Sequence, residues 1–439
     1  MSSRRGLISG KTPIDQPGKQ TSRSINFALS ERGRSALRAV QLEDAVLQDA
    51  IPMYSRMVHP VRGSSYEVPY GERGECIYSV GRRRINELLL NAASASANVS
   101  LHFGVKLSKL NCERGTVTLT AADGDEERAE QGDFVFGCDG IHSASRHQML
   151  QQCSDSHSFR EDYIDHGYKE LTIESTSGSD SPHRPYAMPP NHLHIWPRKE
   201  FMLIALPNPD GSFTCTLFMP MGIFETLTTP DQASKFFKQH FPDVLDLIGE
   251  SELDHQFRSN PTSRLSYLHV SPWTTGKYCV VGDAAHAVVP FYGQGMNCGF
   301  EDCLLFDQLL QQCQQTAASK DLLTAAAQLF YQHRKPDADA LCQLSLENYI
   351  EMRSKVSDPL FLMKKRIDSL INYLFPHEWI PQYTMVAFTR TRYSDVIRRR
   401  DRQNTIVTSC ASGLVACALA AAALLAVRCS QALLKRTSV

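Results

Sequence analysis

The chain has 439 residues, of which 42% are hydrophobic and 21% charged. This length predicts two or three domains, or one large domain with a second layer, and the composition supports a sizeable core and argues against global disorder. The formal net charge of −1 argues against nucleic acid as a bulk electrostatic partner. The 13 cysteines show no CxxC pairs and no zinc-knuckle spacing, which predicts reduced thiols and no metal site.

The N-terminal segment Met1–Arg23 is rich in Ser, Lys, Arg, Pro and Gly. It has no apolar run, so it is not a secretory signal. We expect residues 1–22 to be a disordered or mis-joined start, and a transit-like peptide is the alternative. The next segment, Ile25–Val40, has helix-like apolar spacing and could be capped by Ser24 or Ser30.

A short strand, Cys76–Val80, runs into a helix that starts near Arg82. In this helix Ile85, Leu88 and Leu89 fall on one face, at i, i+3 and i+4 spacing. Further strand-like runs follow at Val99–Leu110, Gly115–Ala121 and Asp133–Gly140. This order indicates parallel-type strands combined with helices.

The middle of the chain, Tyr168–Pro220, is typical of antiparallel β-structure, because short apolar runs are broken by Pro, Asn and Gly. An amphipathic helix near Asp231–Phe241 follows, and the apolar strand Tyr278–Val281 leads towards a long helix from about Met296. After Ala317 the pattern is almost wholly helical. The predicted fold class is therefore α/β (α+β), with a nucleotide-type domain interrupted by a β-rich insert.

The segment Ile406–Val427 carries no charge and is long enough to span a bilayer core as a helix. Cations flank it on both sides: Arg398, Arg399, Arg400 and Arg402 before it, and Arg428, Lys435 and Arg436 after it. We therefore expect a C-terminal transmembrane helix whose orientation the charges leave open. The alternative is a buried, Ala-rich core helix.

The strongest chemical signal is GDAAH, at Gly282–His286, followed by GQGMN, at Gly293–Asn297. An apolar strand runs directly into the first segment, where the carboxylate of Asp283 could accept hydrogen bonds from sugar-like hydroxyls. The second segment opens a helix whose first N–H groups are unpaired and favour negative charge. This suits a reduced flavin, and the alternative is a plain strand–turn–helix. We interpret His286 as structural, and no Ser-His-Asp or Cys-His pairing favours hydrolysis.

A further segment, FGCDG, places Asp139 and Gly140 before Arg146. A strand ending in Asp-Gly is common, but together with GDAAH and GQGMN it resembles the motifs of the class A FAD-dependent aromatic hydroxylase family. Between about Arg23 and Arg400, other segments resemble the members that hydroxylate L-kynurenine: RSINFALSERGR, LHIWPR, FTCTLFMP, GQGMNCGFEDCLLFD, YIEMR and IPQYTMVAFTRTRY.

This resemblance implies an FAD-dependent monooxygenase that converts L-kynurenine to 3-hydroxykynurenine with NADPH and O₂. The flavin would carry the chemistry, so no catalytic side chain is expected. The implied cofactor contacts are Ala28, Arg82, Leu107, Asp139, Asp283, Gly295, Met296 and Asn297. The implied substrate contacts are Arg56, Tyr70, Phe291, Gln294, Asn348 and Tyr383. Arg56 would pair with the substrate's carboxylate, which the planar fork of a guanidinium fits, although Arg56 or Tyr70 taken singly indicates only a solvated charge or a packing residue.

The resemblance also divides the chain into an unmatched segment at 1–22, an FAD-binding Rossmann-like domain at 23–165 and 270–320, a β-rich substrate domain at 166–269, a helical region at 321–400 and the membrane anchor at 406–427. The anchor resembles that of animal members at the mitochondrial outer membrane. We therefore expect this location, with the catalytic part on the cytosolic side.

One family motif is missing, since the chain contains no GxGxxG anywhere. The family opens with a strand, this glycine-rich turn and a helix, and the turn cradles the pyrophosphate. We therefore expect an FAD-binding domain that is truncated at its start. The alternatives are a membrane-tethered, inactive protein that cannot hold FAD, and a related hydroxylase that acts on another ring.

Overall fold

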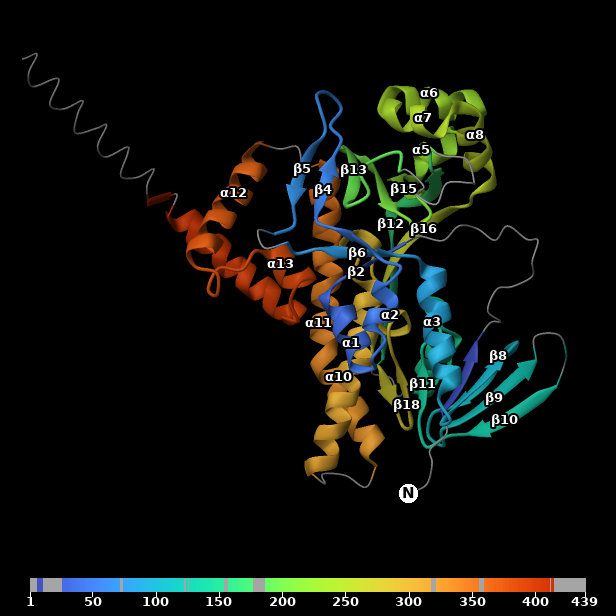
Figure 1. Ribbon diagram of the computed structural model, residues 1–439. Helices are drawn as coiled ribbons and strands as arrows, with labels where there is room; N and C mark the ends of the chain where they lie inside the picture. Colours follow the sequence, from blue (N-terminus) through green and yellow to red (C-terminus); the bar gives the residue numbers. More distant parts are fainter. Residues whose placement is uncertain are drawn as a thin grey trace, which may run out of the picture.

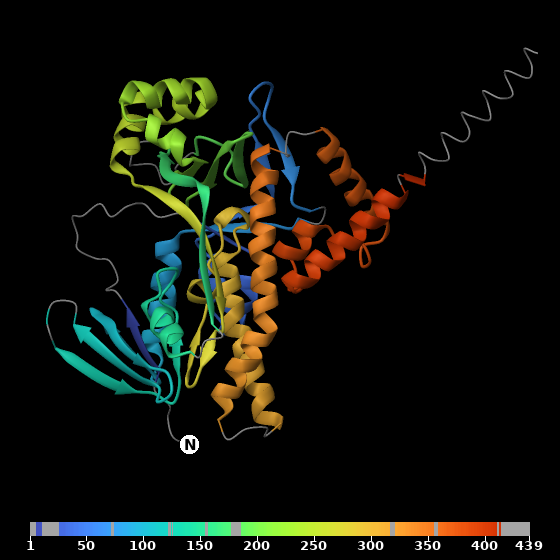
Figure 2. The same cartoon turned by 180° about the vertical axis from the view of Figure 1, so that it is seen from behind.

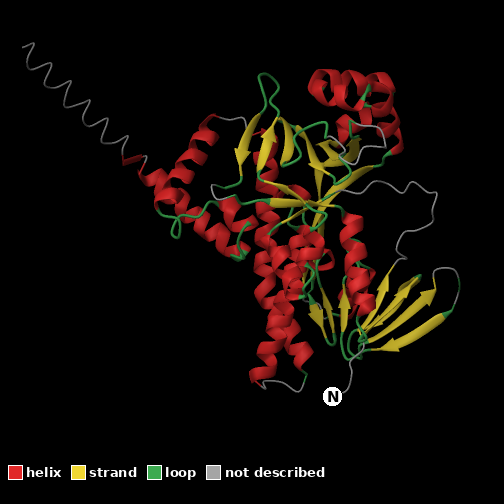
Figure 3. Ribbon diagram, viewed as in Figure 1, coloured by secondary structure: helices red, strands yellow, loops and turns green. Residues whose placement is uncertain are grey.

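The structure is a computed structural model of the 439-residue chain (Figure 1). It describes residues 6–10, 26–71, 74–121, 124, 126–153, 157–176, 186–316, 321–354, 359–410 and 412–413. A long helix runs through the middle of the molecule. The largest sheet and its covering helices lie at one end, and a smaller sheet lies at the other (Figures 1 and 3).

The first described layer is a small antiparallel sheet. Strand β6 (Ile77–Val80) pairs with β2 (Phe27–Leu29) on one side and with β3 (Ile51–Met53) on the other. Helix α1 (Glu31–Ala39) follows β2, and helix α3 (Arg82–Ala95) follows β6. The strand and helix expected around Arg82 are therefore confirmed.

The helix expected over Ile25–Val40 begins only at Glu31. The reason is that residues 27–29 form a strand on β6, and such pairing across some 50 residues cannot be read from local apolar spacing. Ser30 is the N-cap residue, but its side chain makes no capping bond. Its backbone N–H instead donates to Oδ1 of Asn297 at 2.8 Å.

A second layer lies at the end of the molecule away from the largest sheet (Figure 1). It contains an antiparallel sheet of β8 (Val105–Asn111), β9 (Thr116–Ala121) and β10 (Glu127–Gln131). Beside it, β7 (Val99–Phe103) pairs in parallel with β1 (Gly6–Gly10), a strand that the composition of the N-terminus did not indicate. The rest of the N-terminal segment, 1–5 and 11–25, lies outside the described residues.

The strands that lead into Asp139 and Asp283 are neighbours in one sheet. Strand β11 (Val135–Gly137) pairs in parallel with β18 (Tyr278–Val280), which also pairs with β17 (Thr274–Thr275). Helix α4 (Ala144–Gln152) follows β11, and the short helix α9 (Asp283–His286) follows β18. Parallel neighbours end at the same edge of a sheet, so the turns after them lie side by side.

The largest sheet has seven strands in the order β16-β12-β15-β14-β13-β4-β5. Their bounds are β16 (Thr262–Ser271), β12 (Ser158–Ile173), β15 (Phe213–Pro220), β14 (Phe201–Pro207), β13 (His192–Arg198), β4 (Ser55–Val58) and β5 (Tyr66–Pro69). All neighbours are antiparallel except β4 and β13, which pair in parallel. This pairing brings residue 56, from the nucleotide-type half of the chain, onto the β-rich insert.

Four helices cover one face of this sheet (Figure 1). They are α5 (Met221–Thr226), α6 (Pro230–His240), α7 (Pro242–Ile248) and α8 (Glu250–Ser259). Apolar side chains fill the space between the layers, including Trp196, Phe213, Phe237, Phe241 and Leu253. Burying large apolar side chains is the main source of stability here. The other face of the sheet lines the cavity described below.

After Ala317 the described residues are almost wholly helical, as expected. The remaining helices are α2 (Glu43–Leu47), the 3₁₀ turn η1 (Pro290–Tyr292), α10 (Gly295–Thr316), α11 (Leu322–Ser354), α12 (Pro359–Leu374), α13 (Gln382–Ala387) and a helix over 393–410. Helices α10 and α11 pack side by side through the centre of the molecule. Helix α12 and the helix over 393–410 project to one side (Figure 2).

The expected transmembrane helix is corrected by the structure. Among the helices that are described, none is both long and apolar enough to cross a bilayer. Residues 406–410 continue the helix that starts at 393, which carries the arginines at 398–400 and 402, and arginine is costly to place in a bilayer core. Of the expected span, residues 411 and 414–427 lie outside the described residues. The mitochondrial location stays a prediction.

Candidate active site

A cavity of about 240 Å³ lies between the seven-stranded sheet and the start of α10. Strand residues form one wall, among them Leu193, Met202, Ile204, Leu206, Thr216 and Phe218. The opposite wall comes from the turns around α9 and η1. The lining is mostly apolar, with a few polar groups at its two ends, which is the usual character of a small-molecule site.

At one end of the cavity lies the buried cation Arg56, which is 4% exposed. Its guanidinium carbon lies 4.9 Å from the ring centre of Tyr383 and 5.9 Å from that of Tyr70, and these two rings stack at 5.0 Å. Burial opposes the charge, but the two tyrosines and Glu351 more than offset it, so the pKa of Arg56 is raised. Arg56 is therefore a fixed positive charge.

The hydroxyl of Tyr70 is buried and makes no hydrogen bond to any described residue. Burial, followed by the neighbouring Tyr383, raises the pKa of Tyr70 well above its usual value, so the hydroxyl keeps its proton. A buried donor without a partner is unfavourable. The hydroxyl beside Arg56 is therefore suited to an acceptor brought by a ligand, such as a carboxylate.

An aromatic cluster forms part of the cavity wall. Phe291 stacks on Tyr349 with ring centres 3.8 Å apart and meets the edge of Phe218 at 5.0 Å. The side chain of Asn348 donates from Nδ2 to the carbonyl oxygen of Phe291 at 2.7 Å. The ring of Phe291 is thus held in place from α11, and it offers a flat apolar surface to an aromatic ligand.

The other end of the cavity is formed by two glycine turns. Gly282 and Gly293 both have φ near +63°, a conformation that favours glycine. Asp283 follows the first turn, and Gly295 and Met296 follow the second, at the start of α10; all three line the cavity. A Cβ atom on Gly295 would meet nothing within 4 Å, so the cavity is open there.

This end fits the ring system of a flavin. The first N–H groups of a helix have no intrahelical partners and favour negative charge, and the exposed carboxylate of Asp283 can accept from hydroxyls of a ribityl chain. Gly293, Gly295 and Met296 bring backbone to the cavity with little side-chain bulk between. None of the described residues forms the glycine-rich turn that holds a pyrophosphate.

Asn297 lies just behind this turn and is fully buried. Its Oδ1 accepts from the N–H of Ser30 at 2.8 Å, and its Nδ2 donates to the carbonyl oxygens of Ala28 at 2.8 Å and Gly293 at 2.7 Å. One side chain therefore ties β2, the start of α1 and the start of α10 together. Asn297 supports the cavity and does not line it.

The structure brings eight of the fourteen expected site residues to the cavity lining: Ala28, Arg56, Tyr70, Asp283, Phe291, Gly295, Met296 and Tyr383. Gln294 lies behind the lining, because its amide accepts from the hydroxyl of Tyr393 at 3.0 Å and donates to Ser30 at 3.4 Å. Asn348 and Asn297 also lie behind it. The assignment of these residues to a bound cofactor or substrate stays a prediction.

Three expected cofactor residues lie apart from the lining. Arg82 is exposed at the first turn of α3, with its guanidinium carbon 5.8 Å from the ring centre of Phe27, which does line the cavity. Leu107, on β8, packs against a core cluster. The carboxylate of Asp139 accepts from the N–H and hydroxyl of Ser145, at 2.9 and 2.7 Å, at the start of α4.

Sequence reasoning missed two groups at the site. Glu351 lies on α11 with Oε1 3.6 Å from Nη1 of Arg56. It stands three residues after Asn348, which places both on one helix face, and this spacing could have indicated it. Asn26 and Phe27, at the start of β2, also line the cavity, but no local pattern distinguishes them.

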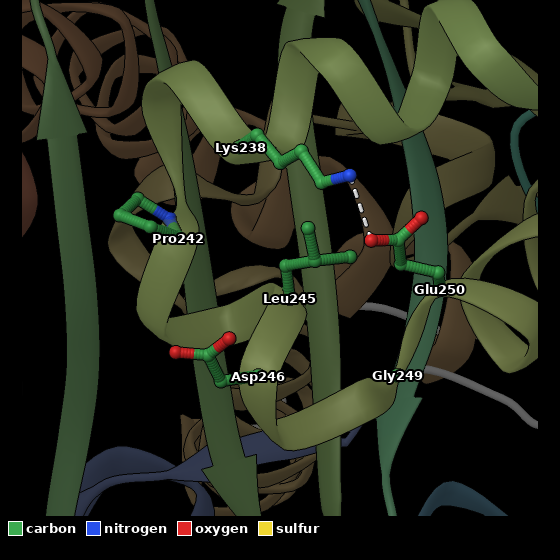
Figure 4. A pocket seen from close by; sticks show the side chains of 6 residues that line it. All are labelled: Lys238, Pro242, Leu245, Asp246, Gly249 and Glu250. Carbon is green, nitrogen blue, oxygen red and sulfur yellow. Dashed lines mark ion pairs between the residues drawn. The ribbon is translucent and has the colours of Figure 1, made fainter.

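A second hollow lies on the surface between α6, α7 and α8 (Figure 4). Lys238 and Glu250 form an ion pair across it at 2.7 Å, and both side chains are more than half exposed. Exposed ion pairs of this kind contribute little. The polar groups that could orient a ligand are gathered in the first cavity.

Comparisons with known proteins decide the family. The FAD binding domain family matches residues 20–343. Kynurenine 3-monooxygenase of Anopheles gambiae is 43% identical over 388 residues, which cover 88% of this chain and 77% of that protein. The enzyme of the same name from Sus scrofa is 42% identical and covers 88% of this chain and 79% of its own length. The chain belongs to the kynurenine 3-monooxygenase family.

The resemblance seen in the sequence motifs is therefore confirmed. Solved structures of more distant proteins share the fold of this kynurenine 3-monooxygenase family member. PqsL of P. aeruginosa, in complex with 2-aminobenzoylacetate, has a TM-score of 0.60 at 17% identity, covering 80% of this chain and 90% of its own. HpxO of Klebsiella pneumoniae, complexed with FAD and uric acid, has a TM-score of 0.59 at 18% identity. The match covers 78% of this chain and 83% of the HpxO chain.

Proposed function

We propose that this protein is an FAD-dependent monooxygenase that hydroxylates L-kynurenine to 3-hydroxykynurenine with NADPH and O₂. The observation that carries this proposal is the polarity of the cavity. One end holds the buried cation Arg56 beside the unpaired hydroxyl of Tyr70. The other end holds the start of α10 and the carboxylate of Asp283. A substrate with an acid group at one end and a reactive ring at the other fits between them.

The protein's own residues would bind and orient the substrate. The guanidinium of Arg56 and the hydroxyl of Tyr70 would receive the α-carboxylate, since both are donors in an otherwise apolar end of the cavity. The faces of Phe291 and Tyr383 would flank the substrate's ring. Holding both ends fixes which ring carbon faces the start of α10, and orientation of this kind accounts for much of enzymatic rate enhancement.

FAD would lie at the α10 end, held by backbone groups of Gly295 and Met296 and by Asp283. When bound and reduced by NADPH, FAD would supply the activation of O₂, and O₂ would be the source of the oxygen atom that is transferred. The apolar lining, including Leu193, Met202 and Phe218, would exclude water from the reacting groups. A missing acid–base pair is therefore no obstacle to this function.

The comparisons do not favour either alternative, an inactive protein or a hydroxylase for another ring. The test is to purify the full chain with added FAD and to measure NADPH oxidation with and without L-kynurenine. We expect a flavin absorbance band, substrate-stimulated NADPH oxidation and formation of 3-hydroxykynurenine. The matched control substrate is the same molecule without its α-carboxylate, which should stimulate poorly. A protein that holds no flavin, or that responds equally to both substrates, would contradict the proposal.

A further inference from the structure

Five charged side chains lie buried directly behind the α10 end of the cavity. We call them the ion network: Arg32, Glu301, Arg334, Asp302 and His286. Each of these side chains is at most 5% exposed. The site described above uses none of them. A cluster of buried charges is costly to desolvate, so its position next to the cavity needs a physical account.

The members of the ion network alternate in sign along an unbroken chain of contacts. Arg32 Nη1 lies 3.0 Å from Glu301 Oε2, and Arg334 Nη2 lies 3.0 Å from the same oxygen. Arg334 Nε lies 2.7 Å from Asp302 Oδ1, and His286 Nε2 lies 2.6 Å from Asp302 Oδ2. Each carboxylate thus lies between two cations or donors.

The ion network is fastened to the backbone that forms the flavin end of the cavity. Oδ2 of Asp302 also accepts from the N–H of Gly282 at 3.2 Å, one residue before Asp283. Arg334 donates to the carbonyl oxygen of Cys298 at 3.1 Å, in the first turn of α10. The glycine turn and the helix start are therefore held in register by the same charged groups.

All five members carry charge near neutral pH. Burial opposes the charge on His286, but the adjacent carboxylate of Asp302 more than offsets it and raises the pKa of His286 well above its usual value. Burial is likewise overcome by the neighbouring cations, which lower the pKa values of Asp302 and Glu301. Three cations thus face two carboxylates, which leaves one surplus positive charge in a buried setting.

Two other charged groups border the ion network. Arg390 reaches Glu301 at 3.4 Å, but its side chain is 37% exposed and screened by solvent. Asp283 is exposed on the cavity side. Arg390 donates to Glu301 only from this partly exposed edge of the ion network, and both groups stay the same in the variants compared below.

A metal ion is a poor explanation of this cluster. Donor atoms of His286, Cys298 and Asp302 do lie within 4.8 Å of one another. However, Arg334 donates to the sulfur of Cys298 at 3.2 Å and to Asp302, so its guanidinium already occupies the position where a metal cation would bind. A bound metal would face an immobile positive charge at contact distance.

We propose that the imidazolium of His286, held charged by Asp302, supplies a fixed positive charge that favours the reduced over the oxidised form of a flavin bound at the start of α10. This inference rests on the proposed function. His286 would act through the electrostatic field and would not touch the substrate, so it is a positioning residue. Fixed charges in a water-poor site act strongly because they need no reorganisation. Reduced flavin carries the negative charge that such a field stabilises.

The charges predict an uncommon pattern among variants. His286→Gln keeps a donor for Asp302 but removes one positive charge, so the surplus falls from one to zero. In Asp302→Asn the carboxylate that holds the proton on His286 is gone, so two opposite charges vanish together and the surplus stays at one. The double variant His286→Gln/Asp302→Asn also has a surplus of one, from Arg32, Glu301 and Arg334.

The experiment compares the affinities of the full-length protein and its variants for oxidised and reduced FAD, through the midpoint potential of the bound flavin. We expect His286→Gln to weaken binding of reduced relative to oxidised flavin by about tenfold, the order of effect of one nearby unit charge in an effective dielectric of about 20. For a two-electron couple this corresponds to a drop of about 30 mV. For the double variant, we expect the ratio of reduced to oxidised flavin affinity to return to within about threefold of the wild-type ratio. His286→Asn is measured in parallel, and thermal unfolding identifies variants that fold.

A purely structural role of His286 predicts a different pattern, in which the midpoint potential of the double variant falls at least as far as that of His286→Gln. That outcome would overturn the inference, as would an unchanged potential in both His286 variants. Wild-type protein that binds no flavin would overturn the proposed function, and this inference with it. Wild-type protein that binds flavin while His286→Gln keeps its potential would overturn this inference alone.

Discussion

Nη1 of Arg56 lies 3.6 Å from Oε1 of Glu351, so the cation of the cavity is paired with a carboxylate of the protein itself. Glu351 also contacts Lys365, with Nζ 3.2 Å from the same oxygen. Burial, which is partly offset by Glu351, lowers the pKa of Lys365. Two cations therefore share one carboxylate of the protein, so a substrate carboxylate could pair with Arg56 without placing an unpaired negative charge in the cavity.

The first prediction concerns Arg56→Ala. We expect the KM for L-kynurenine to rise by about 30-fold or more, since removing one partner of a buried charge pair typically costs about 2–5 kcal/mol. Bound flavin should be unaffected, because Arg56 comes from β4 of the seven-stranded sheet and not from the turns around α9 and the start of α10. The measurement is NADPH oxidation against L-kynurenine concentration, with Arg56→Lys as the matched control of intermediate effect. Undiminished stimulation in Arg56→Ala would refute its role with the carboxylate.

The second prediction concerns Asn297→Ala. Its side chain satisfies three backbone groups at buried positions, so we expect a loss of roughly 2–4 kcal/mol in the free energy of unfolding. Asn86→Ala, at an exposed position on α3, should change it by less than about 0.5 kcal/mol. Denaturant unfolding of both variants provides the test. Equal stabilities would show that Asn297 does not hold the three segments together.

The third prediction concerns pH. Nε2 of His59 lies 2.9 Å from Nδ1 of His194, whose Nε2 lies 2.8 Å from the carbonyl oxygen of Pro189. A carbonyl can only accept, so Nε2 of His194 carries the hydrogen and Nδ1 accepts from His59. The ring of His194 is therefore neutral, because its Nδ1 can accept only without a proton. Desolvation by burial lowers the pKa of each to about 4.

Because this value lies below the unfolded value of about 6.5, the unfolded chain takes up these protons first. The stabilising contribution of the neutral pair is present above about pH 6.5 and is lost as the pH falls towards about 4. We expect the wild type to lose roughly 2–3 kcal/mol more than His194→Gln over this range. Urea unfolding at several pH values checks this, with His147→Gln as an exposed control. Parallel pH profiles for wild type and His194→Gln would contradict it.

The fourth prediction concerns Lys169, which is 5% exposed and donates from Nζ to the carbonyl oxygen of Phe257 at 2.9 Å and to that of Asn260. It thus closes the end of α8. Lys169→Met keeps the packing but leaves these carbonyls without their donor, so we expect a loss of about 1–3 kcal/mol. Lys235→Met, exposed on α6, is the control. Thermal unfolding that gives the same midpoint for both variants would rule this role out.

Local patterns in the sequence predicted much of the fold and part of the site. Three features are each encoded within about twenty residues: the strand before Arg82, the helix from Gly295 and the turn that carries Asp283. The structure has all three where expected. Leu107 and Asp139 illustrate what local patterns cannot give. Which face Leu107 presents depends on the partners of β8, and the carboxylate of Asp139 serves the start of α4.

The cavity also depends on contacts between segments far apart in sequence. Gln294 has the residue type of a pocket amide, but Tyr393, about a hundred residues later, takes up its oxygen. Glu351 and Arg56 lie nearly three hundred residues apart. Short-range spacing therefore identified the two ends of the site, whereas the residues behind its walls required the tertiary structure.

The parallel pairing of β4 with β13 has a consequence for folding. It places Ser55 opposite His192 and Arg56 opposite Leu193, so two segments separated by 137 residues must meet before Arg56 reaches its place. No hairpin can make this connection, and closing such a long loop is slow. We therefore expect the part of the cavity around Arg56 to form only once β13 is available to pair with β4. A nascent chain that has not yet synthesised residues 192–198 has no place to receive a substrate.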